Sequence, residues 1–354
     1  MAARVAALPP ADRQAALAEA GYVAPHWPPP YGLGASAADL LVIDEELHRA
    51  GLARPDLVIG GWAGLAVVQH GSPAQRERFA GPTLRGQITW CQLFSEPEAG
   101  SDLASLRTRA ERVTGEEGNG WRLTGQKVWT SLAHEADWAI CLARTDPAAP
   151  KHRGLTFFLV DMRSDGIGIR PLRELTGRAV FNEVFLDGVF VPDDCVVGEC
   201  GDGWRIARST LASERVAMGR GSALGEEVED LLARVRSAGL AADRPVLREL
   251  GTLVAGGLAG SLLDLRSAQA QLDGTDASHL GAVRKLLGVA HRQAVAETAL
   301  MLTGPDGAAA DGPAADPVAA FLLTRCLSIA GGTTQILLSV VAERVLGLPR
   351  EEMR

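Results

Sequence analysis

One stretch, Trp90–Asp102, reads WCQLFSEPEAGSD and joins strand-forming residues to a turn of small residues. Pro97 supplies no amide donor, and it restricts the residue before it to an extended backbone. The turn that follows, Ala99–Asp102, contains a glycine, which lets the backbone approach a ligand closely. Amides and hydroxyls on such a turn suit the polar edge of a ring or a phosphate. Because many turns of this composition bind nothing, the stretch indicates a site only together with a second pattern.

The second pattern, Gly125–Ser131, reads GQKVWTS. Together the two segments resemble the flavin-binding core of the acyl-CoA dehydrogenase family. The first matches the family's TEPxAGSD motif, with Ser95 in place of threonine, and the second matches GxKxWITN. The resemblance extends to Pro192–Asp194 and to the tail from Gly332 to Arg350, so it covers nearly the whole chain. Several ordered motifs are far more specific than any one of them alone.

The resemblance implies an FAD cofactor and assigns residues to it. The backbone of Phe94 and the hydroxyl of Ser95 would face the flavin pyrimidine edge, and Trp129 would pack on the ring system. The residues expected at the cofactor are Phe94, Ser95, Gly100, Ser101, Trp129, Thr130, Ser131, Thr333, Thr334 and Gln335. Those expected at the substrate are Ser101, Arg215, Gly331 and Gly332. A tryptophan is also a common core residue, so that alternative stays open for Trp129.

The resemblance also implies a carboxylate base, which removes an α-proton while hydride leaves the β-carbon for flavin N5. In most of the family this base precedes the Gly-Thr of the C-terminal motif. This chain has Gly331 at that position, and glycine cannot act as a base. The other known position, as in isovaleryl-CoA dehydrogenase, lies in an LxxER pattern. Leu211–Arg215 matches that pattern and assigns the base to Glu214.

Helical spacing supports Glu214 independently, since Ala207, Leu211, Glu214 and Met218 fall on one face of a helix. A carboxylate on an apolar stripe is desolvated, which raises its pKa and its basicity. Alternatively, Glu214 forms a structural ion pair with an arginine at a helix interface. Arg215 likewise either contacts the substrate or makes a plain ion pair.

The composition limits the class of protein. The chain has 354 residues, 47% of them apolar, which is enough for a large core in two or three domains. A net charge of −8 argues against a nucleic-acid partner, because phosphate binding needs a basic face. The seven histidines form no HxH or HxxxH pair, so no metal site is expected.

The cysteines and the N-terminus bear on the compartment. The cysteines show no CxxC pair, which predicts buried thiols in a reducing compartment. They are Cys91, Cys141, Cys195, Cys200 and Cys326. The N-terminus has prolines and charges where a signal peptide has an apolar run, and no stretch of about 18 apolar residues lacks charge. A cytoplasmic protein without a membrane span is therefore expected.

The periodicity of apolar residues changes twice along the chain. Residues 1–88 are helical, with Ser36 expected to cap a helix. Residues 89–198 alternate as strands do, with a turn expected at Asp187–Gly188. Residues 199–354 are again helical. This order predicts an α+β fold with an N-terminal helical domain, a middle antiparallel β-barrel or sandwich on the flavin-ring side, and a C-terminal helical bundle, as in acyl-CoA dehydrogenases.

Two segments of the family are not found. In family homo-oligomers, an Arg-x-x-Phe-Gly segment and a Gln-x-x-Gly-Gly segment reach the FAD of a neighbouring subunit. Here the corresponding stretches, Ala241–Leu250 and Leu300–Gly304, lack the Phe-Gly and the glutamine. Either the chain is the catalytic subunit of a heteromer whose partner supplies these groups, or it is a homodimer that holds FAD through residues such as Arg244 or Arg248. The expected assembly is a dimer or tetramer.

The expected function is FAD-dependent α,β-dehydrogenation of an acyl-CoA thioester to the 2-enoyl-CoA, within fatty acid or lipid metabolism. The family implies an electron-transfer flavoprotein as the electron acceptor. Two alternatives stay open: a flavin monooxygenase or oxidase of the same fold, and a non-catalytic partner subunit of a heteromeric acyl-CoA dehydrogenase. Small residues near Glu214, such as Ala217 and Gly221, would leave room for a bulky or branched acyl group, but the sequence does not identify that group.

Overall fold

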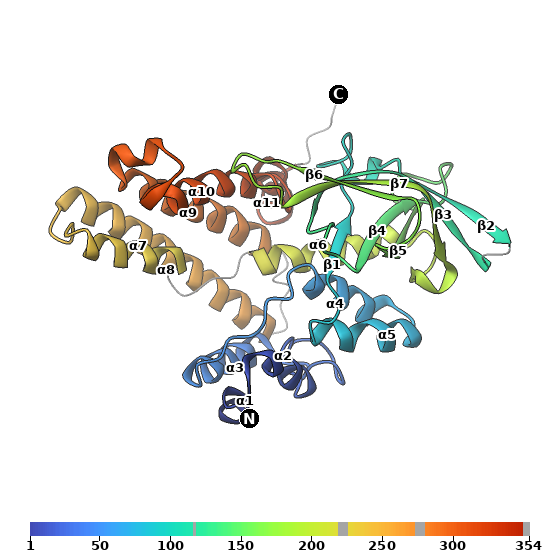
Figure 1. Cartoon of the computed structure of the whole chain (residues 1–354), viewed down its shortest axis with the longest axis horizontal. Helices are drawn as coiled ribbons and strands as arrows, with labels where there is room; N and C mark the ends of the chain where they lie inside the picture. Colours follow the sequence, from blue (N-terminus) through green and yellow to red (C-terminus); the bar gives the residue numbers. More distant parts are fainter. Residues whose placement is uncertain (116–117, 219–225, 273–279, 350–354) are drawn as a thin grey trace. The chain divides into compact units, whose positions relative to one another are not determined.

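A computed structural model describes residues 1–115, 118–218, 226–272 and 280–349; within these ranges, the side chains of 212–218 and a few other positions lie outside the description. The chain divides into two compact units, Met1–Ser213 and Glu214–Arg354. The expected α+β order is confirmed, since helices precede a sheet and further helices follow it (Figure 1). The three-domain boundaries expected at 88/89 and 198/199 stay a prediction.

The first unit begins with helices whose starts are encoded by serine caps. Ser36 accepts the amide of Asp39 at 3.2 Å, and Ser72 accepts the amide of Gln75 at 3.2 Å. The expected helix start at Ser36 is therefore confirmed. The helices are α1 (Ala2–Ala6), α2 (Pro10–Glu19), α3 (Ala37–Arg49), α4 (Gly60–His70) and α5 (Pro73–Leu84).

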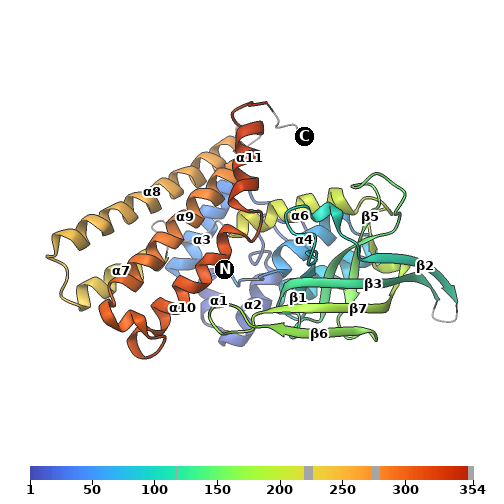
Figure 2. The same cartoon turned by 90° about the horizontal axis from the view of Figure 1, so that it is seen from above.

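An eight-stranded sheet follows, with the strand order β6-β7-β3-β2-β4-β5-β8 and with β1 paired to β4. Strands β6, β7 and β3 lie side by side in Figure 2. The strands are β1 (Trp90–Leu93), β2 (Arg109–Gly115), β3 (Gly118–Ser131), β4 (Trp138–Arg144), β5 (Leu155–Asp161), β6 (Ile167–Leu172), β7 (Phe181–Pro192) and β8 (Val196–Val197). Most pairs are antiparallel, as expected, but β4 runs parallel to β1 and to β2. Parallel pairing requires a long crossover, and the chain between β1 and β4 is long enough to contain both β2 and β3.

The core of this unit joins the sheet to the helices α4 and α5. Phe79 of α5 makes an edge contact with Trp138 of β4, with ring centroids 4.8 Å apart, and lies 5.6 Å from Trp90 of β1. Strand β5 is buried from Leu155 to Val160. A strand enclosed on both faces is apolar throughout rather than alternating. The sheet that carries both candidate binding segments is therefore rigidly packed.

The turn expected at Asp187–Gly188 is wrong, because β7 continues through these residues. The register with β3 passes from Leu123 opposite Val189 to Gly125 opposite Leu186, so two residues of β7 oppose one of β3. Gly188 has φ +64°. An extra residue in a left-handed conformation produces a bulge inside a strand, and sequence alone does not separate this bulge from a hairpin.

The second unit is helical apart from its connections. Helix α6 (Gly203–Met218) begins in the first unit and ends in the second. The other elements are α7 (Glu226–Ser237), α8 (Arg244–Leu272), α9 (Leu280–Met301), α10 (Ala315–Thr324) and α11 (Thr334–Arg344), with short 3-10 turns at Gly304–Ala308, Gly312–Ala314 and Arg325–Ser328. Helix α9 packs against α7, α8, α10 and α11 (Figure 2). The core between α7, α8 and α9 includes Val228, Leu231, Leu253 and Val295.

Among the described residues, one helical segment, Arg244–Ser267 of α8, is long and apolar enough to cross a membrane by length and composition alone. Of the residues in its most apolar 18-residue window, 22% are buried. A single segment of this kind is weak evidence, because core helices of soluble proteins meet the same criterion. The expected absence of a membrane span stays a prediction.

The structure separates the cysteines by accessibility. Cys91, Cys141 and Cys195 are buried, but Cys200 is exposed and Cys326 is half-buried, so the expectation of buried thiols is wrong for Cys200. Burial raises the pKa of the Cys141 thiol to about 11 and that of the Cys195 thiol to about 12.

We expect iodoacetamide at pH 7.5 to alkylate Cys200 in the native protein and to leave Cys91, Cys141 and Cys195 unmodified. The thiolate is the nucleophile, and burial suppresses both its formation and its access to reagent. Peptide mass spectrometry after a short labelling time gives the modified fraction of each cysteine, with a urea-unfolded sample as the control. Labelling of Cys141 as fast as that of Cys200 in the native protein would contradict the structure.

Candidate active site

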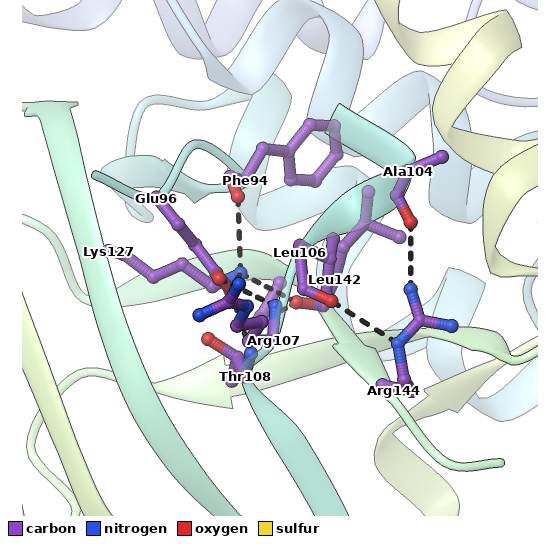
Figure 3. A network of polar contacts seen from close by, with 10 residues as sticks. Phe94, Glu96, Ala104, Leu106, Arg107, Thr108, Lys127, Leu142 and Arg144 are labelled. Carbon is purple, nitrogen blue, oxygen red and sulfur yellow. Dashed lines mark hydrogen bonds and ion pairs between the residues drawn. The ribbon is translucent and has the colours of Figure 1, made fainter. Parts of the chain in front are cut away.

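The chain between β1 and β2, residues 94–108, carries the first motif and is fixed to the sheet by a buried ion pair (Figure 3). Lys127 Nζ lies 2.9 Å from Glu96 Oε1, and the two side chains are 0% and 8% exposed. The same ammonium donates to the carbonyl oxygen of Phe94 at 3.1 Å and to that of Leu142 at 2.8 Å. An ammonium has three donors, and each has an acceptor here. Lys127 therefore ties the start of the motif to β3 and β4.

Glu96 closes the far end of the same loop. Its carboxylate accepts the amide of Arg107 at 2.6 Å and that of Thr108 at 2.9 Å. Burial raises the pKa of Glu96, but the Lys127 ammonium and these hydrogen bonds outweigh it and hold the pKa below its ordinary value. Glu96 is thus ionised, and its pairing offsets the cost of burying two charges.

Arg144 of β4 supports the same loop from a second side. Its Nη2 donates to the carbonyl oxygen of Ala104 at 2.7 Å and its Nε to that of Leu106 at 3.2 Å (Figure 3). These contacts hold the 3-10 turn Leu103–Ser105, which follows Ser101 and Asp102. The loop is therefore held at its start by Lys127 and near its end by Arg144.

The two motifs meet through the backbone, because the amide of Val128 donates to the carbonyl oxygen of Ser95 at 2.9 Å. Beyond that point, Glu96 and Ala99 exchange two backbone hydrogen bonds of 3.1 Å, which form a tight turn. Gly100 and Ser101 lie exposed at its end. A Cβ built on Gly100 would meet no atom within 4 Å. No part of the described chain therefore requires a glycine there, which fits a residue reserved for close approach of a ligand.

Trp129 is turned outward by an irregularity in β3. The register with β7 passes from Lys127 opposite Val184 to Thr130 opposite Asn182, so β3 has one extra residue there. Trp129 has φ +61° and is 60% exposed. Its ring meets only the edge of Phe181, at 6.0 Å, among the ring contacts described for it. A bulky residue in left-handed backbone is strained by about 1–3 kcal/mol, and such strain concentrates at functional sites. The alternative of a core tryptophan is therefore excluded.

The two residues after Trp129 differ in accessibility. Thr130 is 1% exposed, and its carbonyl oxygen accepts the side-chain amide of the buried Asn182 at 3.1 Å. The side chain of Thr130 is therefore enclosed by the protein. Ser131 is half-buried. Their assignment to the cofactor stays a prediction, and Ser131 has the more accessible hydroxyl.

The second unit holds the remaining candidates. Thr333 caps α11, and its hydroxyl accepts the amide of Ile336 at 3.2 Å. Thr334 is half-buried and Gln335 is exposed. Gly331 and Gly332 precede this cap and are half-buried. The C-terminal motif thus forms the start of a helix, as expected, while its contacts with a ligand stay predictions.

Glu214 and Arg215 lie in the helical backbone of α6, but their side chains are outside the described residues. On the same helix face, Ala207 is buried and Leu211 half-buried. The helix and its apolar stripe agree with the spacing argument. The role of Glu214 as the base and that of Arg215 at the substrate stay predictions.

The sequence motifs assign no role to Glu96, Lys127 or Arg144. A signal existed for Lys127, which occupies an inward position of an alternating strand where an unpaired charge would be costly. No comparable pattern marks Arg144, because its acceptors are backbone carbonyls of a distant loop. Within the described parts of the chain, no three His, Cys, Asp or Glu residues form a group that could hold a metal ion.

We expect Lys127→Met to destabilise the first unit by about 3–5 kcal/mol, because it leaves the Glu96 carboxylate buried without its cation. The double variant with Glu96→Gln should lose less than the sum of the two single losses, since neither charge is then left alone. Urea unfolding followed by circular dichroism measures these free energies. Glu98→Gln is the matched control, because Glu98 is 71% exposed and should cost less than about 1 kcal/mol. Additive single losses would contradict the pairing.

The same pair predicts a dependence of stability on pH. Since the pKa of Glu96 is lowered in the folded state, its contribution is complete above the ordinary carboxyl range, near pH 4.3. It is lost as the pH falls through the lower folded-state value. The stability advantage of the wild type over Glu96→Gln should therefore shrink from pH 5 downward. An advantage that grows on acidification would show that Glu96 is buried in its neutral form.

Comparison with known proteins places this chain in one family. Models of the acyl-CoA dehydrogenase N-terminal, middle and C-terminal domains match residues 2–87, 91–189 and 201–346. Acyl-CoA dehydrogenase FadE34 of Mycobacterium tuberculosis is 58% identical over 348 residues, which are 98% of this chain and 48% of that protein. This chain thus spans about half the length of FadE34. Acyl-CoA dehydrogenase IpdE1 of the same organism is 40% identical over 346 residues, 95% of this chain and 87% of that protein.

Two solved structures share the fold over nearly their whole length. One is described as the Tcur3481-Tcur3483 steroid ACAD, with a TM-score of 0.82 and 28% identity over 99% of this chain and 96% of that one. The other is the ChsE4-ChsE5 complex from Mycobacterium tuberculosis, with a TM-score of 0.80 and 26% identity over 96% of this chain and 90% of that one. Three domain models in family order, the IpdE1 match over most of both chains and the joined sequence motifs agree: this chain belongs to the acyl-CoA dehydrogenase family.

Proposed function

We propose that this chain is the flavin-ring half of an acyl-CoA dehydrogenase that oxidises an acyl-CoA thioester to the 2-enoyl-CoA. The observation that carries the proposal is the hydrogen bond between the two motifs, from the Val128 amide to the Ser95 carbonyl. The buried Glu96–Lys127 ion pair joins the same two segments. Trp129, which follows Val128 in the second motif, is exposed and has a strained backbone. Membership of the family supplies the reaction class.

The residues present fit an FAD cofactor. Gly100 leaves room above the turn, and the exposed indole of Trp129 offers an apolar face to a flat ring. Ser95, Ser101 and Ser131 supply hydroxyls around this area, and the Lys127–Glu96 pair keeps the loop in place without using these hydroxyls. When bound, FAD supplies the acceptor for the hydride that leaves the β-carbon of the substrate.

Glu214 is the proposed base. With glycine at the alternative base position, Gly331, Glu214 is the carboxylate that the family pattern assigns to proton removal. It would take the α-proton of the thioester, and Arg215 would lie near the substrate. Enclosure on the apolar stripe that contains the buried Ala207 would raise the pKa of Glu214 and improve it as a base.

A second subunit or second half completes the site in this proposal. FadE34 is about twice as long as this chain, and a neighbour of the same fold was solved as a two-protein complex. Both findings fit the missing Phe-Gly and glutamine segments. Helix α8 also exposes an apolar face, which would be covered in an assembly. Its exposed leucines are Leu247, Leu258, Leu262 and Leu265. The partner is therefore proposed to be another acyl-CoA dehydrogenase chain that carries the segments missing here.

The proposed substrate is a bulky acyl-CoA. The small residues on α6 near Glu214 support a roomy pocket, and a structural neighbour is described as a steroid ACAD. Electrons would pass to an electron-transfer flavoprotein, and the protein would act in the cytoplasm. A polycyclic acyl group is the form of bulk that these observations favour.

The proposal predicts the visible spectrum of the purified chain. Alone and supplied with FAD, it should retain little flavin. Together with a family chain that carries the Arg-x-x-Phe-Gly and Gln-x-x-Gly-Gly segments, it should bind flavin, which should bleach under anaerobic conditions on addition of an acyl-CoA. A series of straight, branched and polycyclic acyl-CoAs tests the substrate, with the polycyclic thioesters expected to reduce flavin fastest. A chain that binds FAD stoichiometrically alone and turns over would refute the heteromer, and a sharp preference for short linear chains would refute the roomy pocket.

Glu214→Gln should lower the rate of flavin reduction by at least about a hundredfold and leave flavin content unchanged, because general base catalysis contributes about 10²–10⁴ in rate. Glu229→Gln, an exposed glutamate on α7, is the matched control and should keep the wild-type rate. Stopped-flow absorbance under anaerobic conditions measures both variants. Full activity of Glu214→Gln in the assembled enzyme would remove the assignment of the base.

A further inference from the structure

A buried lysine of α9, Lys285, is bonded to the glycine turn that precedes α11. Lys285 is 2% exposed. Its ammonium donates to the carbonyl oxygen of Gly332 at 2.6 Å and also to that of Ala330. Burying an ammonium costs several kcal/mol unless its donors are satisfied. A methionine or leucine would fill the same space without this cost, so packing alone does not account for a lysine at this position.

The two acceptors fix how the turn presents its amides. Gly331 has φ +64° and Gly332 has φ +97°, so both lie in the left-handed region that favours glycine. In a trans peptide the carbonyl and the following N–H point in opposite directions. Because the carbonyls of Ala330 and Gly332 point to Lys285, the amides of Gly331 and Thr333 point away from it. One buried cation thus sets the direction of two peptide units.

The contact also changes the electrostatics of these peptides. A charged donor on a carbonyl makes a stronger hydrogen bond than a neutral one and polarises the peptide, so its N–H becomes a better donor. Thr333 is the N-cap of α11, where the helix dipole adds partial positive charge. The two amides are therefore polarised in the same sense by two sources. Negative charge is favoured on the side of the turn away from Lys285.

From these contacts we infer that Lys285 is a positioning residue, which orients and polarises the Gly331–Thr333 turn to stabilise the thioester oxygen as the α-proton is removed. This inference rests on the proposed function. In that step the α C–H bond breaks, its proton goes to the Glu214 carboxylate, and its electron pair is shared onto the thioester oxygen. The step needs no oxidant. Donors directed at such an oxygen are worth more in the transition state than in the ground state.

Exchange of the α-proton with solvent isolates this step from hydride transfer. The probe is the 3-thia analogue of the acyl-CoA that the wild-type enzyme oxidises fastest; it has an acidic α-proton and no β-hydrogen to lose as hydride. The assembled FAD enzyme is incubated with the analogue in D2O, and mass spectrometry follows deuterium uptake. Flavin content and the unfolding temperature are measured on the same samples.

Three variants separate charge from packing. Lys285→Gln keeps hydrogen-bond donors but removes the charge, Lys285→Arg keeps both, and Arg236→Gln removes an exposed cation of α7 as the matched control. Lys285→Gln should bind FAD and keep its KM for the acyl-CoA substrate. Its exchange rate and its kcat should fall by about ten- to a hundredfold. This is a smaller loss than the roughly 10²–10³ in kcat that follows removal of an oxyanion donor. Lys285→Arg should exchange within a few-fold of wild type, and the control at the wild-type rate.

The outcomes distinguish this inference from the proposed function. If Lys285→Gln folds, binds FAD and exchanges at the wild-type rate, the lysine has no electrostatic role and the inference is refuted. If Lys285→Gln does not fold, Lys285→Arg decides, and a folded Arg variant with wild-type flavin content but exchange as slow as without enzyme refutes it. A wild-type enzyme that neither oxidises any acyl-CoA nor exchanges the α-proton of its analogue refutes the proposed function itself.

Discussion

The buried pair of Glu96 and Lys127 is the constraint on which the first unit depends. An ammonium that is fully buried must find three acceptors, and here they come from the loop after β1, from the carboxylate of Glu96 and from β4. Two of these bonds hold the loop, at Phe94 and Glu96, and the third attaches it to β4 at Leu142. The carboxylate extends the constraint to the far end of the loop through the amides of Arg107 and Thr108. The same loop also buries Phe94, Ala99, Leu103, Ala104 and Leu106 in the core, so polar and apolar burial together specify its shape.

Two residues near this ion pair, Gly100 and Trp129, have few contacts within the described chain. Gly100 has no neighbour that requires a glycine, and Trp129 is held outward in a strained backbone with most of its ring exposed. Both features cost stability in the protein alone. They are consistent with a surface that is completed when a flat ligand binds, because the strain and the exposed area are then offset by new contacts.

Lysine is used in the same way in both units. The chain has only three lysines, Lys127, Lys151 and Lys285, and two of them are buried and donate to backbone carbonyls of a loop that carries a family motif. The other 32 of its 35 Lys and Arg residues are arginines. A compact ammonium with three rotatable donors suits a buried cluster of carbonyl oxygens. Lys285 does for the glycine turn before α11 what Lys127 does for the loop after β1.

The sequence by itself determined the order of helices and strands, the family and the location of both motifs, because apolar periodicity, the Ser36 cap and short local patterns are properties of neighbouring residues. It failed where one local pattern fits two structures: Asp187–Gly188 forms a bulge within β7 rather than a turn, and Cys200 is exposed while Cys91 is buried. Only the tertiary structure decided which polar residues are buried and what they hold. Apart from the Glu96 carboxylate, the described acceptors of Lys127, Arg144 and Lys285 are backbone oxygens far away in the chain. Every residue type has a backbone oxygen, so the sequence does not identify such acceptors. Burial turns these charges from solvated groups into constraints, and burial is a property of the fold rather than of any segment.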